Sequence, residues 1–220
     1  KEINFIGRRK ENFNDNFFEI PNLLNSYWAG FIAADGNIRK NNQALGIQIG
    51  NKDSQHLEQF KKDLESDGHI AYYTRKNGIS MVSMSLRSRK MVEDLKRNFS
   101  ITPQKTFTLM PPNIDGKNKE AFIIGYIDGD GHILRRKNHK TGQYYPNLVG
   151  FGAVGTKELL TWIRKDISDF LGRELTNKIL FKNDKKTIFC FSFIGTEGYS
   201  YLKYLKKIDV PKLDRKWSKV

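Results

Sequence analysis

The chain has 220 residues, with 38 Lys or Arg against 24 Asp or Glu, and its net charge of +14 favours a polyanionic partner, although many basic proteins bind no nucleic acid. Its one cysteine, Cys190, excludes a disulfide within the chain and argues against a cysteine-based zinc site. No apolar run approaches the ~20 residues of a membrane span, and no signal peptide opens the sequence, so we expect an intracellular protein.

Residues 1–20 mix basic and aromatic side chains. Arg8 and Arg9 are followed by Phe17 and Phe18. We interpret this segment as an N-terminal arm that either packs on the body of the protein or contacts backbone phosphate. Packing is favoured because aromatic side chains gain free energy on burial.

Residues 21–110 form the first predicted half-domain. Apolar periodicity predicts its helices, and alternation predicts its strands. In the strand at 43–50, for example, Leu45, Ile47 and Ile49 alternate with small or polar residues. The predicted elements are a helix at 23–35, strands at 37–39 and 43–50, a helix at 52–66, strands at 69–75 and 79–86, and a helix at 88–98.

A linker is predicted at 111–117, where Pro111, Pro112 and Gly116 interrupt regular structure. The second half-domain, 118–220, repeats the order of the first. Its predicted elements are a helix at 119–130, a strand at 132–136, a basic loop at 137–145, a strand at 148–155, a helix at 157–171, strands at 178–181 and 187–194, a helix at 197–206, and a basic tail at 212–220.

Each half therefore has the order helix, hairpin, helix, hairpin, helix. The pattern predicts an α+β protein of two pseudo-symmetric αββαββα halves. An antiparallel sheet can be covered by helices on one face and leave the other face free. Two such free faces, side by side, would form a saddle.

One segment occurs twice, at 27–38 and 122–133, and each copy is an apolar run that ends in Asp-Gly. The two Asp-Gly pairs are 95 residues apart, which suits two similar domains. Small residues spaced four apart would let two such helices pack with their backbones close together. These helix-interface residues are Gly30, Ala34, Gly125 and Gly129.

The acids of the two copies, Asp35 and Asp130, would lie at the last turns of these helices. A carboxylate at a helix C-terminus opposes the macrodipole, and two of them side by side also repel each other. Cations bound between them would remove both penalties. An Asp before Gly is by itself more often a turn residue, and the symmetric pairing is what favours a ligand role.

The repeated segments resemble the motif of the LAGLIDADG homing endonucleases, in the single-chain form that carries two motifs. The first copy has Ala33 in place of the earlier Asp of the motif, and the second has Gly129 in place of Ala. The resemblance implies a monomeric, site-specific endonuclease that cuts both strands of a long asymmetric DNA target, and whose gene an intron or intein carries. It also implies that Asp35 and Asp130 bind Mg²⁺, for which Mn²⁺ substitutes, that Ca²⁺ supports binding without cleavage, and that the backbone carbonyls of Ala34 and Gly129 are further candidate ligands.

Three further polar residues resemble active-site residues of the family. Lys105 and Lys216 occupy matching places after the last helix of each half and would stabilise charge at the scissile phosphates. Lys212, Arg215 and Lys219 are rivals of Lys216, and a solvated lysine is the alternative role. The third residue is Gln48, whose counterpart in the second half is read as Ala153, so the sequence predicts two unequal cutting centres. Asp128 is expected to face away from Asp130 and to make helix-end hydrogen bonds.

Polar side chains gather in the predicted hairpins of the free face, which would make the saddle a DNA-binding surface. Lys and Arg can neutralise phosphates, while Asn, Gln and Arg can read base edges. Ordinary solvated turns are the alternative. The predicted DNA-contacting residues are Arg39, Lys40, Asn42, Gln43, Arg75, Lys76, Asn77, Arg135, Arg136, Lys137, His139, Lys140, Tyr144, Lys182, Lys185 and Lys186.

Two other classes of function remain open from the sequence. The same scaffold could serve as an RNA maturase that binds intron RNA, or as a DNA-binding regulator that does not cleave. A basic protein-interaction domain is the third class, and it leaves the paired Asp-Gly helices unexplained.

Overall fold

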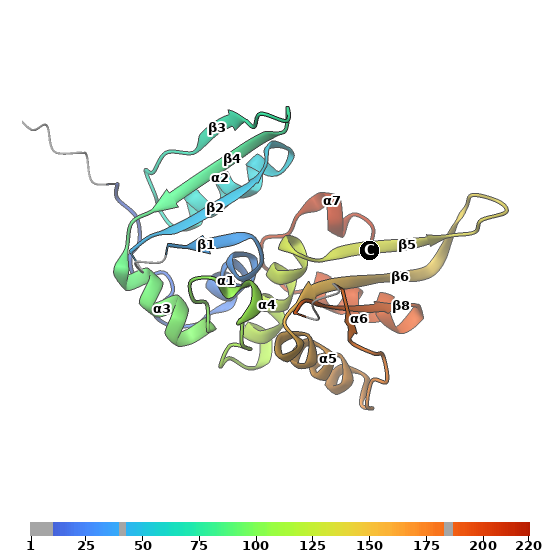
Figure 1. Cartoon of the computed structure of the whole chain (residues 1–220). Helices are drawn as coiled ribbons and strands as arrows, with labels where there is room; N and C mark the ends of the chain where they lie inside the picture. Colours follow the sequence, from blue (N-terminus) through green and yellow to red (C-terminus); the bar gives the residue numbers. More distant parts are fainter. Residues whose placement is uncertain (1–10, 40–42, 183–186) are drawn as a thin grey trace, which may run out of the picture.

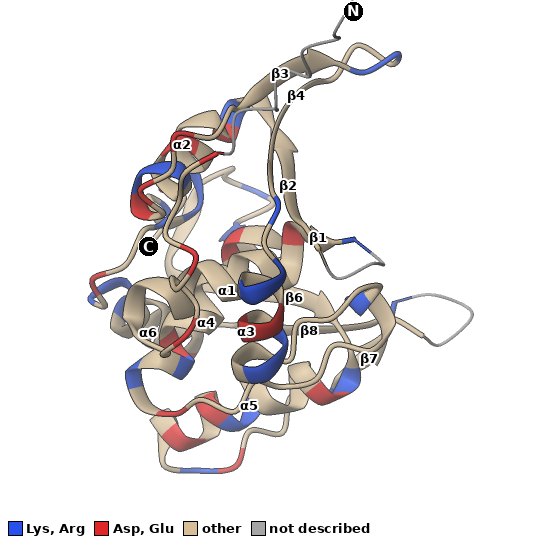
Figure 2. Ribbon diagram, turned by 90° about the vertical axis from the view of Figure 1, so that its left-hand side faces the viewer, with Lys and Arg blue, Asp and Glu red and all other residues tan. Residues whose placement is uncertain are grey.

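The computed structural model describes residues 11–39, 43–182 and 187–220. Two four-stranded antiparallel sheets, with strand orders β1-β2-β4-β3 and β5-β6-β8-β7, lie on either side of a central pair of helices, α1 and α4 (Figure 1). Figure 2 shows α2 on one side of the first sheet, whose other face is open. This arrangement confirms the predicted α+β architecture of two similar halves.

The first half contains α1 (Leu23–Asp35), β1 (Gly36–Ile38), β2 (Leu45–Gly50), α2 (Ser54–Asp63), β3 (Ala71–Thr74), β4 (Ser80–Leu86) and α3 (Arg89–Phe99). The second half contains α4 (Gly116–Gly129), β5 (His132–Lys137), β6 (Tyr144–Gly155), α5 (Lys157–Leu171), β7 (Leu180–Phe181), β8 (Phe189–Ile194), α6 (Thr196–Lys206) and α7 (Asp214–Trp217). Of the helices in these described ranges, none is long and apolar enough to cross a membrane.

Local sequence explains where the helices begin and which faces they bury. Asn22 caps α1 reciprocally with Asn25, and Ser88 caps α3 through the backbone N–H of Met91. The helices α1 and α4 are buried on nearly every side, as expected of a segment that is apolar all round. They form the centre of a core that continues into both sheets.

The two motif helices touch through their backbones. A Cβ atom at Gly30 would lie 2.0 Å from the carbonyl oxygen of Phe122, and one at Gly125 would lie 2.0 Å from the carbonyl oxygen of Tyr27. At the ends of the helices, a Cβ atom at Gly129 would lie 2.2 Å from that of Ala34. Side chains are therefore excluded at these crossings, and the predicted packing of the motif helices is confirmed.

Several predicted boundaries are wrong. The strand β6 begins at Tyr144 instead of 148, because the β5–β6 ladder resumes at Lys137 and Tyr144 after a register shift. The predicted loop at 137–145 is correspondingly shorter, and the ribbon extends beyond the rest of the sheet (Figure 1). In addition, α4 begins within the predicted linker, β7 has two residues, and the predicted tail contains α7.

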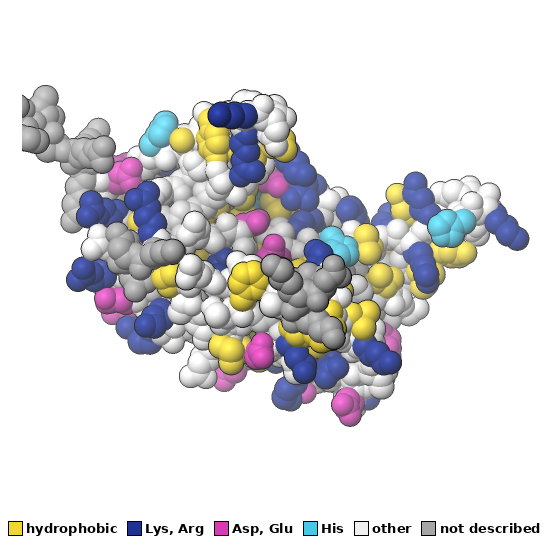
Figure 3. Space-filling model, in the orientation of Figure 1, with side chains coloured by type: hydrophobic (Ala, Val, Ile, Leu, Met, Phe, Trp, Pro, Cys, Tyr) yellow, Lys and Arg dark blue, Asp and Glu magenta, His cyan; other side chains and the backbone are white. Residues whose placement is uncertain are grey.

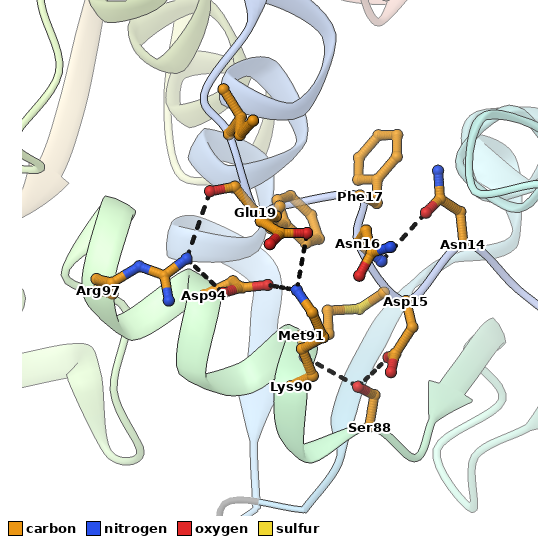
Figure 4. A network of polar contacts seen from close by, with 12 residues as sticks. Asn14, Asp15, Asn16, Phe17, Glu19, Ser88, Lys90, Met91, Asp94 and Arg97 are labelled. Atoms are coloured by element: carbon orange, nitrogen blue, oxygen red, sulfur yellow. Dashed lines mark hydrogen bonds and ion pairs between the residues drawn. The ribbon is translucent and has the colours of Figure 1, made fainter.

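The N-terminal arm packs on the first half over residues 11–20. Phe17 and Phe18 are buried in the core. Polar contacts fix the arm to α3, where Asp15 accepts a hydrogen bond from Ser88 and Glu19 pairs with Lys90 (Figure 4). This part of the arm therefore packs as favoured, whereas Arg8 and Arg9 lie outside the described residues.

Candidate active site at the junction of the two halves

The two acids lie where the motif helices give way to the first strand of each sheet. Asp35 is the last residue of α1, and Asp130 caps α4. Each is followed by a glycine with no left-handed backbone, Gly36 and Gly131. These glycines are required by crowding instead, since a Cβ would lie 2.7 Å from the carbonyl oxygen of Ile32 in the first copy and 2.6 Å from Cα of Ile127 in the second.

The acids hold their protons more tightly than isolated aspartates. Burial against the helix ends and the charge of Asp130 raise the pKa of Asp35 to about 6, although Lys216 and Lys105 oppose the shift. Burial also raises the pKa of Asp130, opposed first by Lys105 and then by Lys216. Both residues keep an exposed side at the surface. The carboxylates thus form a cluster of unfavourable negative charge that a cation could approach.

Two buried lysines flank the acids. Lys105 lies in the 3₁₀ turn Lys105–Phe107 and donates from Nζ to the carbonyl oxygen of Ala34 at 3.2 Å. Lys216, in α7, donates from Nζ to the carbonyl oxygens of Ile127, Asp128, Gly129 and Gly131 at 2.5–3.1 Å. Burial lowers the pKa of both lysines, that of Lys216 to about 8. The structure therefore brings together both acids and both predicted lysines.

The rivals of Lys216 have other partners. Arg215 forms a bidentate ion pair with Asp53, in which its Nε and one terminal guanidinium nitrogen lie 2.6 and 2.7 Å from the two carboxylate oxygens. Lys212 donates to the carbonyl oxygens of Ile208 and Val210, and Lys219 donates to that of Ile133. Of these four residues of the C-terminal segment, Lys216 is the one that reaches the end of α4.

Asp128 does face away from the acid pair, but its predicted role at the helix end is wrong. Its carboxylate is buried and accepts hydrogen bonds from the Tyr27 hydroxyl at 2.8 Å, the Leu213 N–H at 3.0 Å and the Trp217 indole N–H at 2.8 Å. Burial outweighs these bonds and raises its pKa to about 6. Asp128 therefore fixes the segment that carries Lys216 to both motif helices.

His56 extends this buried network and was missed from the sequence. Its Nε2 lies 2.8 Å from the Tyr27 hydroxyl oxygen. Because the hydroxyl donates its proton to Asp128, His56 Nε2 is the donor in this contact. Burial lowers the pKa of His56 to about 4, which keeps the ring neutral. No spacing rule in the sequence predicts this hydrogen-bond network, since Tyr27, His56 and Asp128 come from α1, α2 and α4.

The counterpart of Gln48 is Val154 and not Ala153. Gly46 pairs with Asn37, two residues after Asp35, and Gly152 pairs with His132, two residues after Asp130. The residue two further along is Gln48 in β2 and Val154 in β6. Ala153 is 1% exposed and points into the core. Gln48 is exposed and accepts a hydrogen bond from Arg75 at 3.0 Å, so a polar side chain in one half corresponds to an apolar one in the other.

The site fits a divalent cation through two carboxylates. Hard oxygen ligands suit Mg²⁺, which usually completes its coordination with water and phosphate. Among the described residues, no group of three or more His, Cys, Asp or Glu could hold a metal. The carbonyls of Ala34 and Gly129, the other predicted ligands, accept hydrogen bonds from Lys105 and Lys216. A recess of about 490 Å³ opens beside the end of α1, and its lining includes Lys105 and Arg39.

The predicted DNA-contacting residues within the described ranges are exposed, except Gln43, which is partly exposed. Figure 3 shows acidic side chains near the middle of one face and Lys and Arg side chains over the first sheet and the β5–β6 ribbon. The predicted residues in the first half are Arg39, Gln43, Arg75, Lys76 and Asn77, and those in the second are Arg135, Arg136, Lys137, His139, Lys140, Tyr144 and Lys182. Lys40, Asn42, Lys185 and Lys186 lie outside the described residues.

The geometry thus defines an α+β protein of two similar halves with an acid pair at their junction. No family model and no curated protein matches the sequence. Solved structures do match. The LAGLIDADG homing endonuclease I-GzeII, in complex with its DNA target, has 14% identity and a TM-score of 0.57 over 89% of each chain.

Two meganucleases give similar results. I-SmaMI, bound to uncleaveable DNA with a TTCT central four, has 13% identity and a TM-score of 0.57 over 88% of each chain. I-AabMI, a LAGLIDADG meganuclease bound to uncleaved DNA, has 12% identity and a TM-score of 0.54 over 86% of this chain and 85% of its own. The chain therefore has the fold of these LAGLIDADG endonucleases.

Proposed function

We propose that the chain is a LAGLIDADG homing endonuclease that acts as a monomer and makes a double-strand break in a long asymmetric DNA target. The observation that carries the proposal is the pair Asp35 and Asp130, which two crossing helices bring together beside two buried lysines. The structures that share the fold are DNA-bound endonucleases, which supports the same activity here.

The chain's own residues would bind and orient the DNA at this site. Basic side chains of both sheets neutralise backbone phosphates on either side of the acids. Lys105 and Lys216 place a positive charge beside the acids, where it stabilises negative charge that develops on a phosphate oxygen. A Mg²⁺ ion held by Asp35 and Asp130 would supply Lewis acidity and lower the pKa of a water molecule.

The expected cofactor behaviour follows from the same ligands. We expect Mg²⁺ and Mn²⁺ to support cleavage and Ca²⁺ to support binding alone. I-SmaMI has been crystallised with uncleaved DNA in the presence of calcium ions, which agrees with this expectation for a related fold. With about ten phosphate contacts, log K for DNA should fall with log salt at a slope of about −9.

The test is selection of cleaved sites from a random DNA library, followed by cleavage of the selected site by variants. Asp35→Asn and Asp130→Asn should each lower cleavage by about 10²-fold or more while DNA affinity in Ca²⁺ is retained. Asp169→Asn, which changes an exposed acid of α5, is the matched control and should cleave normally. Wild-type cleavage by both motif variants would show that the acids are not the metal ligands.

Other outcomes separate the alternatives. Tight DNA binding without cleavage in Mg²⁺ or Mn²⁺ would identify a DNA-binding regulator. Preferential binding of structured RNA over every DNA in the library would identify an RNA maturase. Either result would overturn the proposed nuclease.

A further inference from the structure

Equivalent positions on the open faces of the two sheets carry opposite chemistry. In the first half, Arg39 donates its backbone N–H to the carbonyl oxygen of Ala44, and continuing the β2–β4 register by one residue places Arg87 on the other side of Ala44. Both arginines are exposed. Arg39 and Arg87 thus lie side by side across β1, β2 and β4, four residues beyond Asp35. We call such a set of laterally neighbouring positions a row, and this row of the first sheet is cationic.

The same row of the second sheet is aliphatic. Leu134 pairs with Gly150, and Gly150 pairs with Ile194. Leu134 lies four residues after Asp130, as Arg39 lies four residues after Asp35. Leu134 and Ile194 are each 41% exposed, so the core does not account for them.

The aliphatic row borders a hollow with a basic rim. A Cβ at Gly150 would lie 2.1 Å from the carbonyl oxygen of Phe193, so no side chain fits there and the floor between Leu134 and Ile194 stays bare. The hollow has a volume of about 370 Å³ and is also lined by Leu148 and by Arg135, Arg136, Lys137 and His139. Figure 3 shows hydrophobic side chains gathered over the strands of this half beside basic ones.

The basic residues around the hollow indicate which kind of partner binds over Leu134 and Ile194. From His132 to Thr156 the sequence contains no Asp or Glu and four Lys or Arg, so the surface complements a polyanion. It lies about 13 Å along the strand from the acid, at about 3.3 Å per residue. Within the major groove of DNA, the apolar group that aliphatic side chains contact is the C5-methyl group of thymine, whereas arginine prefers guanine.

We propose that Leu134, Leu148 and Ile194 contact thymine methyl groups, so that the second half reads a thymine-containing half-site, while Arg39 and Arg87 make the first half read guanine at the equivalent positions. This inference rests on the proposed function, because it requires the open face to lie in the major groove. The contacted thymines should lie roughly three to six base pairs from the cut, from the 13 Å offset and 3.4 Å per base pair.

The test removes the methyl group alone. In the selected target, each thymine of the second half-site is replaced by uracil, which keeps its base pairing, and affinity is measured in Ca²⁺. Binding should weaken by roughly fourfold for each contacted thymine, the value of one buried CH₂ group. The same replacement in the first half-site should leave affinity unchanged.

Variants assign the effect to the aliphatic row. Leu134→Gln, Leu148→Gln and Ile194→Gln change the three aliphatic side chains that line the hollow, and together they should abolish the difference between thymine and uracil. Met110→Gln, which is also at an exposed position, 52% accessible, is the control and should keep the difference.

Failure of this inference is distinguishable from failure of the proposed function. If the target is bound and cleaved but uracil in the second half-site has no effect, the thymine contacts are wrong and the nuclease stands. If the protein selects no DNA sequence at all, the proposed function fails and this inference fails with it. A discrimination that persists when Leu134, Leu148 and Ile194 are all replaced by Gln would show that other residues contact the methyl groups.

Discussion

The two lysines beside the acid pair occupy matching places, but the protein holds them differently. Lys105 donates to one carbonyl oxygen at the end of α1, whereas Lys216 donates to four at the end of α4. Asp128 and the Asp53–Arg215 ion pair further fix the segment around Lys216. The helix crossing is nearly symmetric and the lysine attachments are not, so the two half-sites share one helix packing but hold their lysines unequally.

The largest loss of stability should come from disrupting the helix crossing that the two halves share. Gly30→Ala would drive a methyl group into the backbone of Phe122, so we expect a loss of more than about 3 kcal/mol in the free energy of unfolding, measured by urea denaturation. Gly125→Ala should lose a similar amount. Gly46→Ala is the control, since its Cβ would lie 3.9 Å from the nearest atoms, and equal stability of Gly30→Ala and Gly46→Ala would contradict the backbone crossing.

The second prediction compares the lysines directly. Lys216→Met removes an ammonium whose three N–H groups are shared among four carbonyl oxygens, so it should cost about 3 kcal/mol of unfolding free energy, against about 1 kcal/mol for Lys105→Met. Both variants should slow cleavage by about 10²-fold or more. Equal losses of stability in urea denaturation would show that the two lysines are held alike.

The third prediction concerns the group that positions Lys216. Asp128→Asn keeps the shape of the side chain but turns one acceptor into a donor, which faces the hydroxyl or N–H donors of Tyr27, Leu213 and Trp217. We expect a loss of about 1–3 kcal/mol in unfolding free energy. With the two DNA strands separately labelled, the variant should slow the nicking of one strand more than the other. Uniform slowing would argue against a role confined to one centre.

The fourth prediction follows from the raised carboxyl pKa values. The pKa of Asp35 is about 6 in the metal-free protein, and its usual value is 3.8, so protons compete with a cation below about pH 6. The affinity of the protein–DNA complex for Ca²⁺ should therefore fall as pH falls. The expected decrease is about tenfold per pH unit for each proton that Ca²⁺ binding releases. A Ca²⁺ affinity that is constant between pH 5 and 7, by calorimetry, would contradict metal binding at this acid.

The smallest effect on cleavage should come from giving both halves the same polar residue at the position of Gln48. Val154→Gln places in the second half the side chain that Gln48 provides in the first. We expect the ratio of the nicking rates of the two strands to change by less than about tenfold, with stability retained, because Val154 is partly exposed. Val154→Ala is the control, and an equal change of the ratio in that variant would show that the amide is not responsible.

Repetition and periodicity made much of this architecture predictable. The two copies of the motif predicted the two similar halves and the helix crossing, and alternation in β2 identified its buried face. Gln48 received the wrong partner because the two hairpins differ in length, so a count along the sequence slipped by one residue. Such a slip exchanges the two faces of a strand.

The network around Asp128 could not be predicted, for a physical reason. Its donors lie up to 101 residues away in the sequence, and they converge only when both halves are folded. The helix α7 has four residues and too few turns to show a period. By contrast, the basic tail that it interrupts was visible from composition alone.

The contact of Gly30 with Phe122 has a consequence for how specificity can change. The crossing that positions the two acids is close because Gly30 and Gly125 pack against backbone atoms of the opposite helix, and Gly129 packs against Ala34. If the chain is the proposed nuclease, mutations can accumulate on the sheets and change the recognised sequence while the offset between its two cuts stays the same. Such a nuclease could acquire new targets and would still leave DNA ends of the same length.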